Sequence, residues 1–249
     1  MSTLILALLA GAVVGLALGA LGGGGSVLAV PALIYLLGFT PAAATTASLF
    51  IVTATSATAL YARARAGHVR WKVGAAFAAA GIVPAALAGL VAARLPQPVL
   101  TAAFAAVAAV AALKMLRPAP PADGHAQAAR PLRAGGAGAG LGAVTGLLGV
   151  GGGFLAVPAL VTVLAFEMQA AVGTSLLVIT VNSLASLVTR SGGAAGLDWA
   201  VTAPFTGAAI LGAWDGKRLA EKVSGRGLRR LFAAVLLAVA GFMLADALT

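Results

Sequence analysis

Two glycine clusters in this sequence have the composition and spacing of a backbone ligand site. The first is Gly22–Ser26 and the second is Gly149–Gly153, and each leads into the same apolar run, LAVPAL. Glycine permits positive φ, and its missing side chain lets the backbone approach a ligand closely. A helix that starts after each cluster offers unpaired N–H groups and the positive end of its dipole, which together bind small anions. The candidate substrate-binding residues at these breaks are Gly23, Gly24, Gly25, Ser26, Gly151, Gly152 and Gly153.

Side-chain donors follow each glycine cluster. Ser48 and Ser175 are 127 residues apart, and Asn182 places an amide in an apolar stretch. A serine in a membrane helix usually bonds to its own backbone, whereas an amide at that depth needs partners and can donate to an anion. We therefore add Ser48, Ser175 and Asn182 to the candidate substrate-binding residues.

The sequence offers little for catalysis or for metal binding. It contains no cysteine, and its two histidines, His68 and His125, fall in predicted loops without metal-ligand spacing. Gly149–Gly153 does not follow a strand of a βαβ unit, so a dinucleotide site is rejected. The acidic residues fall in loops or near the ends of apolar stretches. We expect no enzymatic activity, no cofactor and no metal site.

The composition is that of a membrane protein. Hydrophobic residues make up 61% of the 249 residues and charged residues 9%, whereas soluble domains have about 45–50% and about 25%. The mean hydropathy is +1.06. No charged residue precedes Arg63, and this stretch alone is long enough for about three transmembrane helices. The sequence predicts an all-α polytopic membrane protein.

The chain contains a duplication. Residues 15–33 align with residues 142–160, with 12 of 19 positions identical, and the same register aligns Arg63 with Arg190. These two arginines end equivalent spans, where they either guide anions to the entrances or extend their charges to the interface. The Pro-rich and charged segment between the halves reads as a linker outside the membrane. The predicted units are a first transmembrane repeat (1–116), a cytoplasmic linker (117–133) and a second repeat (134–249).

Each repeat divides into a glycine-broken segment followed by three further apolar spans. Short apolar pieces flank the breaks, and such pieces at matching places in two halves are typical of broken or re-entrant helices. The predicted helical pieces are 4–21, 27–38, 41–61, 73–93 and 97–116 in the first half, then 135–148, 154–165, 168–189, 199–216 and 228–247 in the second.

The distribution of charge favours one topology. If each broken segment folds back as a helical hairpin, the loops 62–72, 114–133 and 215–230 share one side of the membrane. They hold 14 of the 16 basic residues, and only Arg94 and Arg190 fall opposite. The positive-inside rule then predicts cytoplasmic basic loops and termini outside the cytoplasm. Each half crosses an odd number of times in this arrangement, so the two repeats are inverted.

The paired glycine breaks followed by LAVPAL resemble the sulfite exporter TauE/SafE family, and the resemblance covers essentially the whole chain. It implies an inner-membrane carrier of small sulfur-containing anions such as sulfite or organosulfonates, for example sulfoacetate. It places the substrate contacts at Gly22–Ser26 and Gly149–Gly153. The first break differs from the second because Ser26 stands opposite Gly153 and Gly23 opposite Val150.

Three functions remain open from the sequence. The first is an alternating-access transporter that holds its anion at the midplane between the two helix N-termini; the others are a passive anion channel and a membrane subunit without transport. The expected partners are the anionic substrate and the lipid bilayer. The net charge of +10 follows from the basic loops, so we expect no nucleic acid partner. Monomer and homo-oligomer stay open, because glycine stripes serve internal packing or dimerisation.

Overall fold

The computed structural model describes residues 2–92, 96–116, 131–148, 153–189 and 197–248, and their regular structure is entirely helical. The all-α prediction is therefore confirmed for this part of the chain. The helices are α1 (Ser2–Leu21), α2 (Gly24–Pro31), the π-helical η1 (Ala32–Leu36), α3 (Pro41–Arg65), α4 (Trp71–Ala92), α5 (Gln97–Leu116), α6 (Pro131–Leu148), α7 (Gly153–Thr162), α8 (Met168–Thr189), α9 (Trp199–Lys222) and α10 (Gly225–Leu248).

The first interruption is narrower than the sequence suggested. Only Gly22 and Gly23 form a turn, and the helix resumes at Gly24, so Gly24–Ser26 belong to α2. Gly22 has a φ of +66°, a conformation that residues with a side chain rarely adopt. Beyond Pro31, which cannot donate a backbone hydrogen bond, the chain continues as the π-helix η1. The break is thus a tight two-residue turn.

Several helices are apolar enough to cross a bilayer. Among the described residues, the segments Thr3–Leu21, Ala43–Arg65 and Met168–Leu187 combine sufficient length with sufficient hydropathy. Shorter apolar helical stretches occur at Val27–Leu36 and within α4 and α5. The chain is a multi-pass membrane protein by these features.

A stripe of glycines joins α1 to α9. At Gly11, Gly15 and Gly19, a Cβ atom would overlap the backbone carbonyl of a residue in α9. The facing residues are Phe205 for Gly11, Ala209 for Gly15 and Ala213 for Gly19. Because both sets of numbers rise together, α1 and α9 run parallel. The stripe is used within the chain, for close contact between backbones.

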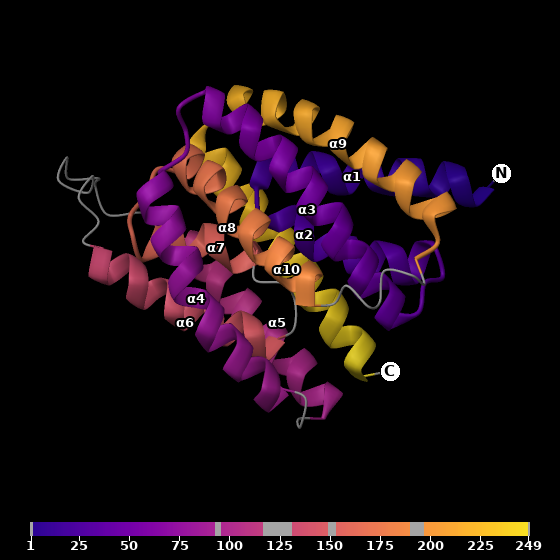
Figure 1. The fold of residues 1–249 in the computed structure, drawn as a ribbon, viewed down its shortest axis with the longest axis horizontal. Coiled ribbons are helices and arrows are strands. Elements are labelled where there is room, and N and C mark those ends of the chain that lie inside the picture. Colours follow the sequence, from indigo (N-terminus) through magenta and orange to yellow (C-terminus); the bar gives the residue numbers. More distant parts are fainter. Residues whose placement is uncertain (1, 93–95, 117–130, 149–152, 190–196, 249) are drawn as a thin grey trace.

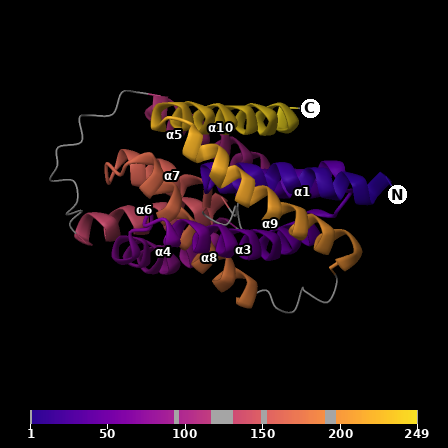
Figure 2. The ribbon, with the colours of Figure 1, turned by 90° about the horizontal axis from the view of Figure 1, so that it is seen from above.

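The equivalent stripe of the second half joins α6 to α4. Gly138 faces the carbonyl of Phe77, and Gly142 faces that of Gly81, so these two helices are also parallel. Figures 1 and 2 show α4 and α6 side by side. Among the other contacts across the halves, three pair equivalent helices: α3 with α8, α5 with α10 and α2 with α7. The two halves are therefore interleaved, since most of their packing is with each other.

The basic segments meet at one end of the bundle. Arg63 in α3 donates to Gln169 in α8, whose amide donates to the carbonyl of Ala220 in α9. Arg229 in α10 donates to the carbonyl of Met115 in α5 at 2.8 Å. Both figures show the start of α1 and the end of α10 at the opposite end. We call the end formed by residues 63–72, 114–116 and 215–230 the basic end.

Candidate functional site

The turn at the first break lies against α8. A Cβ at Gly22 would be 2.6 Å from Ser175 Oγ and 3.2 Å from the carbonyl oxygen of Val172. Both contacts lie early in α8 (Met168–Thr189). The first break therefore contacts the first half of α8, the helix that begins at the basic end.

Gly25 has a packing role that does not depend on a ligand. A Cβ at Gly25 would overlap the backbone of Leu18, which shows that α2 folds back tightly on the end of α1. Gly23 is buried, and Gly24 lies in the first turn of α2. The residue type of Gly25 thus has a structural reason that does not require a ligand.

Part of the predicted site falls outside the described residues. This applies to Gly151, Gly152 and the side chain of Ser26. Gly153 is the first residue of α7. The structure therefore describes the backbone of the first break, and of the second break it describes only the start of the following helix.

The two predicted serines are buried and donate to their own helices. Ser48 Oγ donates to the carbonyl of Thr45 at 2.9 Å, and Ser175 Oγ donates to that of Val172 at 2.8 Å. A hydroxyl has one proton to donate, so each serine retains only its acceptor capacity in this conformation. Of the two, Ser175 is the one that the fold brings to the first break.

Asn182 and Thr55 are the polar residues that the fold leaves unsatisfied in the middle of α8 and α3. Asn182 Oδ1 and Thr55 Oγ1 are buried and have no hydrogen-bond partner among the described residues. Nearby, Thr180 Oγ1 donates to Ser56 Oγ at 3.0 Å and so links α8 to α3. We call Thr55, Ser56, Thr180 and Asn182 the α3–α8 crossing. Since a buried polar group without a partner is costly, this crossing has spare capacity for a polar ligand.

Thr55 was missed as a candidate, although the sequence carries a signal for it. It lies 127 residues before Asn182, the same offset that relates Ser48 to Ser175. The duplication therefore puts a second polar side chain at the position equivalent to the amide. Thr55 is 1% exposed, so its hydroxyl is shielded from bulk solvent in this conformation.

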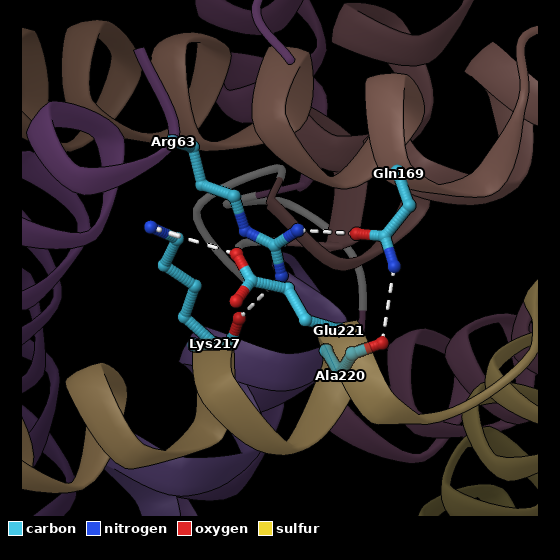
Figure 3. Close-up of polar contacts among 6 residues, drawn as sticks. Arg63, Gln169, Lys217, Ala220 and Glu221 are labelled. Carbon is cyan, nitrogen blue, oxygen red and sulfur yellow. Dashed lines mark hydrogen bonds and ion pairs between the residues drawn. The ribbon is translucent and has the colours of Figure 1, made fainter. Parts of the chain in front are cut away.

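Arg63 forms a polar cluster at the basic end with Gln169, Ala220 and Glu221 (Figure 3). Its guanidinium, with the residue 0% exposed, donates to Gln169 Oε1 and, at 2.9 Å, to the carbonyl of Gly19. The carboxylate of Glu221, itself 3.6 Å from Lys217 Nζ, attracts the Arg63 charge. The side chain is therefore a cross-link of α3 to α1, α8 and α9 rather than an interfacial charge. Arg190, its equivalent, lies outside the described residues.

Neither of two surface cavities resembles an enzyme site. A groove of about 440 Å³ between α5, α6 and α7 is lined by apolar residues, with Lys114 as its only charged lining residue. A smaller basic cavity lies between α3 and α9. Among the described residues, no group of three His, Asp or Glu side chains is placed to hold a metal ion.

Comparisons with known proteins find similarity to membrane transporters. The family model described as "Sulfite exporter TauE/SafE" matches residues 7–243. A "Probable membrane transporter protein" of Xylella fastidiosa strain 9a5c is 35% identical, over 97% of this chain and 95% of its own length. Its counterpart in strain Temecula1 is 34% identical over the same shares. No solved structure matches the chain.

Proposed function

Because the chain belongs to the sulfite exporter TauE/SafE family of membrane transporters, we propose that it carries a small sulfur-containing anion by alternating access. Sulfite and organosulfonates such as sulfoacetate are the proposed substrates. Their oxygens are hydrogen-bond acceptors, so the site must present donors in a place that water leaves during transport.

The observation that carries this proposal is the unsatisfied polar pair at the α3–α8 crossing. Thr55 Oγ1 and Asn182 Oδ1 are buried atoms without a hydrogen-bond partner among the described residues, and none of the crossing residues is acidic. The amide of Asn182 can turn to present its NH2 group, and the hydroxyl of Thr55 can donate directly. Neutral donors attract an oxyanion, and the empty site then avoids the cost of burying an unpaired charged side chain. We place the substrate between these side chains and the first break at Gly22.

The directions of equivalent helices bear on how the two repeats are related. We propose that the repeats are inverted and that each glycine-broken segment is a re-entrant hairpin. Support comes from the directions of the helices. α6 is parallel to α4, which starts at the basic end, so α6 also points away from that end. Its equivalent in the first half, α1, instead ends at the basic end, near Arg63. Equivalent helices then point in opposite directions, as in carriers whose repeats rock around a shared site.

The orientation in the membrane follows from the basic end. We propose that this end faces the cytoplasm of a bacterial inner membrane and that both termini lie outside it. The support is the concentration of Lys and Arg in residues 63–72, 114–133 and 215–230, since basic loops are retained on the cytoplasmic side.

The test is uptake of labelled sulfite into liposomes that contain only the purified chain. We expect saturable uptake, with competition by sulfoacetate and taurine and little competition by chloride. Flux that rises without saturation would favour a passive channel, and no flux by inserted, folded protein would favour a non-transporting subunit. Strong competition by sulfate alone would contradict the assignment of sulfite or a sulfonate as substrate.

A further inference from the structure

A small basic cavity lies on the outer surface of the bundle where α3 and α9 approach the basic end. Its volume is about 300 Å³. Three of the six lining residues are cationic and none is acidic. The lining residues are Tyr61, Ala62, Arg65, Trp214, Lys217 and Arg218. The cavity therefore presents positive charge beside two aromatic rings. This combination suits an anionic ligand that has an apolar part.

The charges around the cavity leave a surplus cation. Lys217 pairs with Glu221 at 3.6 Å, and Arg218 pairs with Asp215 at 3.5 Å. The second pair is mostly exposed, and exposed ion pairs are weak and easily exchanged. Arg65 has no carboxylate partner among the described residues; its guanidinium contacts only the Tyr61 hydroxyl at 3.4 Å and the ring at 5.8 Å. When Glu221 is assigned to Lys217 and Asp215 to Arg218, the positive charge of Arg65 is left for a ligand.

The two aromatic residues place the cavity at the membrane surface. Tyr61 and Trp214 are exposed, and Tyr61 lies in the last turns of the apolar segment Ala43–Arg65. Tyrosine and tryptophan concentrate where the hydrocarbon meets the headgroups, because their rings are apolar and carry one polar atom. If Ala43–Arg65 spans the bilayer, Arg65 is its last residue and lies near the level of the lipid phosphates, so a lipid reaches this cavity more readily than a dissolved anion does.

We propose that this cavity binds the headgroup of an anionic phospholipid. Arg65, Lys217 and Arg218 contact the phosphate, and the start of an acyl chain lies along the rings of Tyr61 and Trp214. The lipid bridges α3 from the first half and α9 from the second. The inference depends on the chain lying in a bilayer and not on the anion that it carries, so its failure would leave the proposed transport function intact.

The test uses the fluorescence of Trp214. With Trp71→Phe and Trp199→Phe, it is the only tryptophan in the chain. The protein is placed in bilayers of phosphatidylcholine and phosphatidylglycerol in which one lipid at a time carries bromine near its glycerol. We expect phosphatidylglycerol to occupy the site about fivefold more than its mole fraction predicts, the preference that one cation at a membrane surface provides. Equal quenching by the two brominated lipids would overturn the proposal.

A matched pair of variants separates this cavity from general attraction to basic loops. Arg65→Gln, Lys217→Gln and Arg218→Gln together remove the cations of the cavity, and we expect them to abolish the preference. The control combines Lys222→Gln, Arg226→Gln and Arg230→Gln, which removes three exposed cations from the same end. We expect the control to keep the preference, and an equal loss in both variants would overturn the proposal.

Two further measurements complete the test. The single variant Arg65→Gln leaves both ion pairs in place, and we expect it to lose most of the preference without loss of folding. Millimolar inorganic phosphate should not change the quenching. If dissolved phosphate displaces the brominated lipid, the cavity is a site for a free anion and the lipid assignment is wrong.

Discussion

Replacement of Gly15 by alanine tests the interleaving of the two halves. A Cβ at this position would lie 2.6 Å from both Cα and the carbonyl carbon of Ala209, whereas ordinary contact begins at 3.4 Å. Backbone atoms cannot rotate away, and the carbonyl oxygen of Ala209 is nearer still, so α1 and α9 would have to separate by more than roughly 0.8 Å along a closely packed stripe. Such overpacking costs about 1–3 kcal/mol. We expect Gly15→Ala to lower the free energy of unfolding by that amount relative to a matched alanine variant.

The matched variant is Gly207→Ala in α9, the helix against which Gly15 packs. A Cβ at Gly207 meets no atom within 4 Å, so this change keeps only the gain of about 0.5–1 kcal/mol that alanine has over glycine in a helix. The gain is common to both variants and cancels in the comparison. Unfolding is followed by circular dichroism in detergent at two protein concentrations. Equal stability of the two variants would refute the packing, and a loss that depends on protein concentration would assign the stripe to a dimer interface.

Three further substitutions probe the site. Gly22→Ala puts a side chain at positive φ and against Ser175, and we expect a loss of about 1–3 kcal/mol in the free energy of unfolding, which denaturation in detergent measures; wild-type stability would contradict the turn. Asn182→Ala should weaken sulfite affinity by about 1–3 kcal/mol in equilibrium binding, while Ser48→Ala, whose hydroxyl serves its own helix, should stay within about twofold; equal effects would remove Asn182 from the site. Arg63→Ala leaves Gln169 Oε1 and a backbone carbonyl unpaired, so we expect each of these acceptors to cost about 1–3 kcal/mol of stability, and an unchanged melting temperature would show that the cluster is not a cross-link.

The helices themselves could be predicted from the sequence because their signals are local. The span 168–189 was predicted with the bounds that α8 has, Met168–Thr189. The glycine stripes were also recognisable, since small residues every four positions lie on one helix face. What the spacing could not provide was the partner of each stripe, because the residues facing Gly15 and Gly142 come from the other half of the chain.

The candidate site was predictable only in part. Asn182 stood out because an amide is rare in an apolar span, but Ser48 and Ser175 proved to be satisfied by their own helices. Gly25 was chosen for ligand approach, yet its missing side chain is explained by the backbone of Leu18. Such contacts depend on the angle at which two helices meet, which residue types do not determine.

The cluster around Arg63 illustrates the limit most clearly. Its partners Gly19 and Gln169 are 44 and 106 residues away, and no local pattern connects them. A basic residue at the end of an apolar span also fits an interfacial charge equally well. Only the packing of α3 against α1, α8 and α9 decides that this arginine is buried.

The most direct test of the central claim is solute counterflow through the purified chain. Liposomes loaded with unlabelled sulfite are diluted into a trace of labelled sulfite, and accumulation of label inside is followed with wild-type protein and with Asn182→Ala. An alternating-access carrier with its site at the α3–α8 crossing predicts a transient overshoot in the wild type that is reduced in the variant. Simple equilibration without an overshoot would contradict alternating access, and identical overshoots in both proteins would contradict the location of the site.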